Sequence, residues 1–188
     1  MDADGQRWDE RYRNRMPGPP TAPRGLGRVT MARGGLCLDI ACGLGEKTMW
    51  AAQNGFEVVA LDVSEVAITV LNTAAMKAGV RDRITSRVYD LDRGLPADYA
   101  GQCALVICER YRDPSLYPQI AYMAAPGGIV TVTVLSQVGY DGTPGRHHAP
   151  PGELVMAFRD LDLEIVGSIE ADGLATLVAR RPSTPDES

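Results

Sequence analysis

The sequence predicts an α/β fold with a mostly parallel sheet of seven strands, helices on both faces and a C-terminal antiparallel hairpin. Two observations carry this prediction. Apolar runs typical of strands alternate with helical segments along most of the chain, as consecutive βαβ units do. The last two apolar runs instead follow each other directly, with Gly173 at the turn between them, which is typical of an antiparallel hairpin.

The first predicted strand, residues 36–41, is apolar almost throughout, as expected for a parallel strand covered on both faces. Gly43 and Gly45 follow it at once. Glycine adopts backbone conformations that other residues resist and lets a ligand approach the main chain closely. A helix is expected over residues 46–54, with Gly55 just past its end. The turn between this strand and this helix is therefore the expected cofactor-binding loop.

The second predicted strand, residues 58–63, carries Asp62 at its carboxyl end. A carboxylate in that place can accept hydrogen bonds from two neighbouring ribose hydroxyl groups. The strand, turn, helix and strand therefore predict a site for a nucleotide-type cofactor. A dinucleotide fingerprint requires a third glycine, at the place that Thr48 occupies here, so the spacing disfavours NAD.

The remaining segments continue the alternation. Ser64 can cap a helix over residues 65–77. Further strands are expected over residues 84–89, 104–108, 128–135, 163–169 and 174–180, and further helices after Pro114 and over residues 153–159. The segment 136–152 breaks all periodicity, and so long a loop in a compact domain is often functional or mobile.

Length and composition favour one catalytic module. The chain has 188 residues, is 45% hydrophobic and has a formal net charge of −5. We expect one domain over residues 1–181, in which residues 1–30 form an N-terminal cap or lid, and a disordered tail over residues 182–188. An acidic chain without a basic run is a poor partner for nucleic acid. The lack of a long apolar run or an apolar leader predicts no membrane partner and a cytoplasmic location; the pattern does not indicate an oligomeric state.

The four cysteines do not predict a metal site. None of them forms a C-x-x-C pair with another, and they lie at positions Cys37, Cys42, Cys103 and Cys108. Three lie in or beside predicted strands, and one lies in the glycine turn. We interpret them as small buried thiols in a reducing compartment.

Several blocks resemble class I S-adenosylmethionine-dependent methyltransferases. Motif I of that family is D-x-G-x-G-x-G, and here its places are taken by Asp39, Ala41, Gly43 and Gly45. The resemblance extends to the small tellurite-resistance, TehB-like group, through WDERYR at residues 8–13, VVALDVSEVAI around Asp62 and PGG at residues 126–128. The blocks stand in the family's order over nearly the whole chain.

This resemblance implies a Rossmann-like methyltransferase fold with S-adenosylmethionine as cofactor. It implies transfer of a methyl group to an oxygen, nitrogen or sulfur atom of a small molecule. It also implies a set of cofactor-binding residues: Trp8, Arg11 and Tyr12 in the cap, Asp39, Ala41, Gly43 and Gly45 in the turn, Asp62 and Val63 at the ribose, Asp90 and Leu91 at the adenine, and Glu109.

Candidate catalytic residues follow the fourth and fifth predicted strands, because ligands bind outside the carboxyl ends of parallel strands. Glu109 can transfer a proton or simply bind the cofactor's amino group. Tyr111 can face the substrate or pack. His147 and His148 can supply a base if their loop folds over the substrate, or they can be solvated. Tyr140 and Arg146 in the same loop are compatible with a polar or anionic acceptor.

Other functions stay open at this stage. Methyl transfer gains much from alignment alone, so a general base is not required. A protein that binds S-adenosylmethionine as a sensor or partner subunit, without transferase activity, would keep the same motifs. An NAD-dependent oxidoreductase is a second alternative. Arsenic methyltransferases share the cofactor fold, but the scattered cysteines do not suggest a three-thiol cage.

Overall fold

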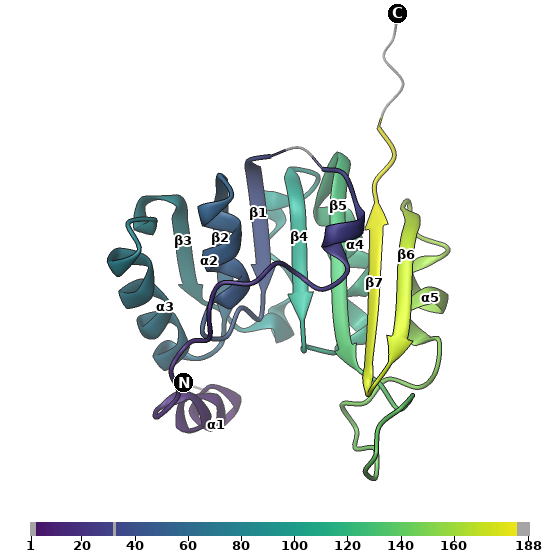
Figure 1. Ribbon diagram of the computed structural model, residues 1–188, viewed down its shortest axis with the longest axis horizontal. Coiled ribbons are helices and arrows are strands. Elements are labelled where there is room, and N and C mark those ends of the chain that lie inside the picture. The colour runs from purple at the N-terminus through teal and green to yellow at the C-terminus, as the bar shows by residue number, and fades with distance from the viewer. Residues whose placement is uncertain (1–2, 32, 184–188) are drawn as a thin grey trace, which may run out of the picture.

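The computed structural model describes residues 3–31 and 33–183 and contains one seven-stranded sheet with helices on both faces (Figure 1). The strand order is β3-β2-β1-β4-β5-β7-β6. Neighbouring strands from β3 to β5 pair in parallel, whereas β7 pairs antiparallel with both β5 and β6. The predicted α/β class, with its parallel sheet and closing hairpin, is confirmed.

The elements follow the predicted alternation. The strands are β1 (Gly35–Ile40), β2 (Phe56–Asp62), β3 (Ile84–Val88), β4 (Cys103–Glu109), β5 (Ala124–Leu135), β6 (Glu164–Ala171) and β7 (Leu174–Arg180). The α-helices are α1 (Ala3–Tyr12), α2 (Glu46–Gln53), α3 (Glu65–Lys77), α4 (Tyr117–Met123) and α5 (Glu153–Phe158). Short 3-10 turns are η1 (Leu26–Arg28), η2 (Arg81–Arg83), η3 (Leu91–Arg93), η4 (Ala97–Tyr99) and η5 (Pro114–Leu116).

Two apolar layers explain why the central strands carry few polar residues. Helices α2 and α3 cover one face of the sheet, where Cys37, Ala60 and Leu105 are buried with them. Helices α4 and α5 lie on the opposite face (Figure 1), where Leu38 and Val106 are buried. A strand that is covered on both faces needs apolar side chains in both directions. Apart from the exposed Glu57 near the start of β2, the charged residues of β1, β2 and β4 lie at or next to the carboxyl ends of these strands.

The N-terminal region lies at that same carboxyl edge. Helix α1 lies below the ends of the strands and contacts α3 (Figure 1). Residues 13–25, which we call the strap, then run without regular structure past the start of α2 to the face of β5 and β7. There the Thr131 hydroxyl donates a hydrogen bond to the Arg24 carbonyl at 3.2 Å. Helix α1 and the first part of the strap therefore border the carboxyl edge of the sheet, whereas Thr30, whose carbonyl accepts a hydrogen bond from Arg180, lies toward the opposite edge; Met1 and Asp2 lie outside the described residues.

The segment 136–152 is fixed at both ends. Ser136 and Ala149 form a β-bridge. The Ala149 N–H donates to the Leu135 carbonyl at 2.7 Å, and the Gly173 N–H donates to the Val138 carbonyl at 2.9 Å. Main-chain hydrogen bonds therefore attach the loop to the adjacent ends of β5 and β7. Of the tail predicted to be disordered, residues 184–188 lie outside the described residues.

Strand β5 begins earlier than predicted. The sequence places its start at Gly128, after a PGG turn, but the strand starts at Ala124, which pairs with Cys103. The register then shifts, so that Leu105 pairs with Ile129. The PGG residues are accommodated by this irregularity in the ladder, which a pattern of apolar residues does not reveal.

Candidate cofactor and acceptor site

The turn after β1 has a backbone that requires small residues. Ala41, Gly43 and Gly45 have φ angles of 55°, 53° and 86°. A Cβ atom at Gly45 would lie 2.3 Å from the Leu71 side chain of α3. The Cys42 N–H donates to the Leu61 carbonyl at 2.9 Å, which ties the turn to β2. The turn therefore brings its main chain next to the end of β2, with Gly43 and Gly45 buried.

Asp62 is the acid at that end, and its side chain is only 6% exposed. Its two oxygens accept hydrogen bonds from the Gly43 N–H at 2.8 Å and the Ser64 N–H at 2.9 Å. Burial raises the pKa of Asp62, although these two N–H groups act in the opposite direction. Each carboxylate oxygen keeps a lone pair for a further donor. The group is thus held in place and can still accept hydroxyl groups from a ligand.

Asp39, on β1, is buried below the turn. The Thr48 hydroxyl of α2 donates to it at 2.5 Å. Burial raises the pKa of Asp39 to about 7; the Thr48 hydrogen bond opposes this, and nearby Glu109 and Asp62 add to it. This carboxyl group therefore changes its charge near neutral pH and responds to any cation placed beside it.

Glu109, at the end of β4, is already engaged by two groups. The Arg24 N–H of the strap donates to it at 2.8 Å. The Lys47 ammonium of α2 lies 3.4 Å from its other oxygen. Lys47 also donates to the Thr21 hydroxyl of the strap at 2.6 Å. A cation and an anion therefore stand side by side next to the glycine turn, and Lys47 was missed in the sequence because lysines are common on helix surfaces.

The predicted cap residues lie along one side of α1: they are Trp8, Arg11 and Tyr12. The Trp8 and Tyr12 rings stack with their centroids 5.5 Å apart, and the Arg11 guanidinium lies 5.1 Å from the Trp8 ring centre. The Tyr12 hydroxyl lies 3.0 Å from the point that a Cβ atom at Gly43 would occupy. Burial, and then Asp62, raise the pKa of Tyr12 to about 12. Tyr12 therefore covers the glycine turn, with Trp8 and Arg11 stacked beside it.

The residues after β3 form a separate corner with Tyr111. Asp90 accepts a hydrogen bond from the Asp92 N–H at 3.0 Å, which caps η3, and Leu91 is 7% exposed. Burial raises the pKa of Tyr111, and Asp113, Asp92 and Asp90 add to it. The structure thus brings Tyr111 to the acidic residues that follow β3, while Val63 lies with Ser64 between Asp62 and the start of α3 along the chain.

The two histidines lie in the loop 136–152 and have different surroundings. His148 packs against Tyr140, with ring centres 4.2 Å apart, and its Nδ1 atom accepts the Gly145 N–H at 3.0 Å. His147 is exposed and accepts a hydrogen bond from Arg146 Nε at 3.0 Å. His148 therefore holds the loop together, whereas His147 faces outward.

The electrostatic neighbours of His147 come from three segments. Burial lowers the pKa of His147, and Arg146, Arg7 and Arg112 lower it further. Arg7 belongs to α1, whereas Arg112 follows β4 and donates to the Arg146 carbonyl at 3.1 Å. Helix α1 and the loop both lie at the carboxyl edge of the sheet (Figure 1), and arginines from both lower the pKa of His147.

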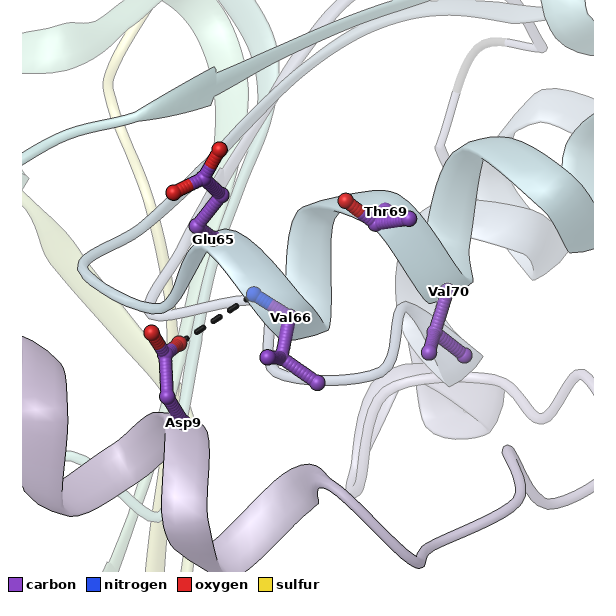
Figure 2. Close-up of a pocket in the computed structure, with 5 residues that line it drawn as sticks. All are labelled: Asp9, Glu65, Val66, Thr69 and Val70. Atoms are coloured by element: carbon purple, nitrogen blue, oxygen red, sulfur yellow. Dashed lines mark hydrogen bonds between the residues drawn. The ribbon is translucent and has the colours of Figure 1, made fainter.

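A cavity of about 320 Å³ lies between α1 and α3 and is lined by Asp9, Glu65, Val66, Thr69 and Val70 (Figure 2). It contains none of the predicted site residues. A second cavity, of about 300 Å³, lies between residues 22–33 and the far end of α2. Both border the N-terminal region, so that region is not packed tightly along its whole length.

The described residues contain no cluster of three or more His, Cys, Asp or Glu side chains that could hold a metal ion. All four cysteines are free thiols. Burial raises the pKa of Cys103 to about 12 and raises those of Cys37 and Cys108. In residues 3–31 and 33–183, no helix has the length and apolar character needed to cross a bilayer.

A parallel sheet with a glycine turn after its first strand and a buried acid after its second defines a nucleotide-cofactor-binding α/β protein. Residues 37–128 match the family model described as a methyltransferase domain. This segment of the chain is therefore similar to a methyltransferase domain. The match agrees with the predicted class and with its predicted cofactor, S-adenosylmethionine.

Solved structures with the same fold include proteins of several activities. One is the [4+2]-cyclase SpnF, with a TM-score of 0.71, 17% identity and coverage of 85% of this chain and 78% of that one. TehB from Haemophilus influenzae has a TM-score of 0.64 and 18% identity, with coverages of 83% and 59%. Geranyl diphosphate C-methyltransferase from Streptomyces coelicolor A3(2), solved with S-adenosyl-L-homocysteine, has a TM-score of 0.65 and 15% identity, with coverages of 81% and 71%. No curated protein matches the chain in sequence.

Proposed function

We propose that this protein transfers the methyl group of S-adenosylmethionine to a small-molecule acceptor that carries an anionic group, a carboxylate or a phosphate. The observation that carries the acceptor class is the set of cations around His147. Arg7, Arg112 and Arg146 come from α1, the β4 exit and the loop, and all three act on His147. Arg7 pairs with Asp4 at 3.1 Å and Arg112 pairs with Glu153, so Arg146, which donates to His147, is the arginine of the three that has no acidic partner among the described residues.

The residues around the glycine turn fit the proposed cofactor. Asp62 can accept the ribose hydroxyl groups. The adjacent charges of Lys47 and Glu109, 3.4 Å apart, suit the carboxylate and the ammonium group of an amino acid. Asp90 and Leu91 stand where the adenine is expected, and Tyr12 covers the turn. These assignments extend the predicted binding set by one residue, Lys47.

The chemistry requires alignment more than activation. S-adenosylmethionine supplies a methyl group on a positively charged sulfur, which is a good leaving group. The acceptor atom forms a bond to the methyl carbon as the carbon–sulfur bond breaks, and the electron pair of that bond stays on sulfur. In our proposal the arginines orient the acceptor by its anionic group. In the same proposal His147, whose pKa is lowered by its surroundings, takes the proton if the acceptor atom carries one.

The relatives support this proposal to different degrees. Geranyl diphosphate is a small phosphorylated molecule, and the enzyme that is named for it shares this fold. We also propose that the chain is similar in role to the TehB group, because WDERYR and the other blocks resemble it. SpnF is described as a cyclase, so the fold by itself does not decide the reaction.

The first test is calorimetric titration with S-adenosylmethionine, S-adenosylhomocysteine and NAD, followed by an assay for S-adenosylhomocysteine formation with carboxylate, phosphate and neutral acceptors. We expect binding of both sulfur compounds and turnover with an anionic acceptor. Binding without turnover of any acceptor would favour a sensor or partner subunit. NAD binding alone would contradict the proposal.

A variant tests the acceptor class directly. Arg146→Ala should raise KM for the anionic acceptor about tenfold or more, since a charge-assisted hydrogen bond is lost, and should leave KM for S-adenosylmethionine unchanged. Arg83→Ala is the matched control, because Arg83 pairs with Glu57 on the surface, at the start of β3. Preference for neutral acceptors, or an equal effect of both variants, would rule out the anionic class.

A further inference from the structure

Asp9 is a buried acid on the exposed helix α1. Its side chain is 9% exposed, whereas its neighbour Glu10 is exposed. Its Oδ1 atom accepts a hydrogen bond from the Ser64 hydroxyl at 2.6 Å and another from the Val66 N–H at 3.1 Å. Figure 2 shows the carboxylate of Asp9 pointing at the first turn of α3. Asp9 thus anchors α1 to α3 by two hydrogen bonds to one charged oxygen.

Ser64 connects this anchor to the ribose acid. It is fully buried, and its N–H donates to Asp62 Oδ1 at 2.9 Å. Its hydroxyl oxygen accepts the Ala67 N–H at 3.1 Å and thereby caps α3. Because a hydroxyl has a single hydrogen to donate, the Ser64 hydroxyl gives it to Asp9. One residue therefore holds α1 through its side chain and Asp62 through its main chain.

Tyr12 lies one turn after Asp9 on the same helix, so both project from the same side of α1. Where Asp9 reaches α3, Tyr12 reaches the glycine turn, 3.0 Å from a Cβ position at Gly43. The position of Tyr12 over the turn therefore depends on the anchor that Asp9 provides.

We propose that Asp9 is a positioning residue for the cofactor: it docks α1 on Ser64 and α3, holds Asp62 in its binding orientation through Ser64 and places Tyr12 over the bound cofactor. This inference goes beyond the proposed function. It rests on the binding of the cofactor, but it does not depend on which acceptor is methylated. Asp9 has no hydrogen bond to the glycine turn or to Asp62: its hydrogen-bonded link to Asp62 passes through Ser64, and its charge adds to the rise in the pKa of Asp62.

A purely structural role would have different consequences. The N-terminus of α3 is already capped by Ser64, so Asp9 supplies a second bond there, to Val66. If Asp9 served only the stability of α3, its removal would lower the free energy of unfolding and leave the affinity for the cofactor unchanged. Because Asp9 is linked to Asp62 through Ser64, we instead expect that removal of Asp9 lowers the affinity for the cofactor in a protein that is still folded.

The experiment uses the full chain with Trp50→Phe, which leaves Trp8 on α1 as the single tryptophan, since the sequence has two. Asp9→Ala is compared with Glu10→Ala, which removes the same charge from the exposed side of the same helix. We measure the Kd for S-adenosylhomocysteine by calorimetry and the acrylamide quenching of Trp8 with and without that ligand.

We expect Asp9→Ala to raise the Kd about tenfold or more, as for loss of hydrogen bonds to a charged group, and to abolish the protection of Trp8 by ligand. Glu10→Ala should match the parent protein in both. Equal Kd values and equal quenching for the two variants would overturn the proposal. So would Trp8 quenching in the parent protein that ligand does not change, whatever the outcome of the methyl-transfer assay.

Two further variants keep the test decisive if Asp9→Ala unfolds. Asp9→Asn keeps the shape and one acceptor oxygen but loses the charge, and it should raise the Kd by a smaller factor, about threefold. In a Tyr12→Ala background, Asp9→Asn should have a smaller effect, because part of its action passes through Tyr12. Fully additive effects of the two substitutions would contradict that path.

Discussion

The charge of Asp39 is set by burial in this fold, and this gives the site a predicted pH dependence. Its pKa of about 7, in place of 3.8 for an ordinary aspartate, follows from its position under the glycine turn. Between about pH 4 and 7 the folded chain therefore holds a proton that the unfolded chain has lost. Stability contributed by this group declines as pH rises through that window and is constant above it.

Cofactor binding should favour the ionised form of Asp39 over the protonated form. The sulfonium and ammonium groups of S-adenosylmethionine favour the charged form of Asp39, which already faces Glu109, Asp62 and the Lys47 ammonium. The Kd should therefore fall as pH rises from 6 to 8, by at most about tenfold per pH unit. Calorimetry at several pH values, in buffers of different ionisation enthalpy, reports the released proton. Asp39→Asn should bind more weakly and with a flat profile; a wild-type profile that is equally flat would refute this linkage.

Ala41 is the residue at which this chain departs from motif I. Its φ of 55° lies in the left-handed region, which costs an L-residue about 1–2 kcal/mol relative to glycine. Ala41→Gly should raise the free energy of unfolding in urea by about 0.5–1 kcal/mol, since glycine's extra freedom in the unfolded chain offsets part of the gain. It should leave the Kd for S-adenosylmethionine equal or lower. A less stable variant would mean that the methyl group of Ala41 has a packing role that outweighs its strain.

Residue roles were partly predictable from the sequence. Asp39, Gly43, Gly45 and Asp62 come together because a strand, a turn and a second strand place them within 25 residues, so local spacing suffices. Asp9 and Lys47 are ordinary surface types on helices, and their roles depend on contacts with Ser64 and Glu109 that join distant segments. Tertiary contacts of that kind leave no periodic signal.

At the scale of elements, the α5 end of the loop 136–152 is held by one carboxylate. Glu153, at the start of α5, accepts hydrogen bonds from Arg112, which contacts it through two nitrogens, and from the Tyr117 hydroxyl at 2.8 Å. Burial disfavours the charge of Glu153, but Arg112 and Tyr117 outweigh it and hold its pKa below the ordinary value. The β4 exit, α4 and α5 are therefore joined beside the loop that carries His147.

Glu153→Gln should lower the free energy of unfolding by about 1–3 kcal/mol near neutral pH, because Arg112 and Tyr117 lose a charged acceptor. The contribution is present above the unfolded pKa of about 4.5 and is lost as pH falls through the lower folded value, so the difference from wild type should vanish in acid. Asp160→Asn is the control, since Asp160 forms an exposed pair with Arg159. If the two substitutions cost the same at pH 7, the cluster does not stabilise the loop end.

Elements were predicted best where one pattern dominates. The boundaries of α3 and β7 agree with the prediction. Ser64 and Gly79 mark the two ends of the helix, and the hairpin turn at Gly173 marks the start of the strand. The course of the strap was not predicted from the sequence, because an extended segment that packs through main-chain contacts has no periodicity of its own. The early start of β5 was missed since a ladder irregularity, and not a turn, absorbs the PGG residues.

For the whole molecule, the sheet order explains why chemistry gathers at one edge. Strands β1 to β5 are parallel, so every loop that follows one of them emerges at the carboxyl edge, and α1 returns to that edge from the N-terminus (Figure 1). The fold class could be predicted because strand patterns and helix patterns alternate along the sequence. The acceptor could not, since the residues that we propose for it come from three segments far apart in the sequence: α1, the β4 exit and the loop 136–152.

Ligand binding should stabilise the whole chain if the cofactor site is formed as described. A ligand at about one hundred times its Kd raises the free energy of unfolding by about 2.7 kcal/mol, and for a chain of 188 residues this corresponds to a rise in Tm of about 5–10 °C. Differential scanning calorimetry with S-adenosylhomocysteine should show that rise, whereas NAD should leave Tm unchanged.

The same measurement on Asp62→Asn separates specific binding from general stabilisation. An amide accepts ribose hydroxyl groups less strongly than a carboxylate does. Its NH2 group is a donor, so the N–H of either Gly43 or Ser64 loses the oxygen that accepts it. The rise in Tm with S-adenosylhomocysteine should therefore shrink in this variant at equal ligand concentration. A rise as large as in the wild type would place the ligand away from β2, and a rise with NAD in either protein would return the dinucleotide alternative that the missing third glycine disfavours.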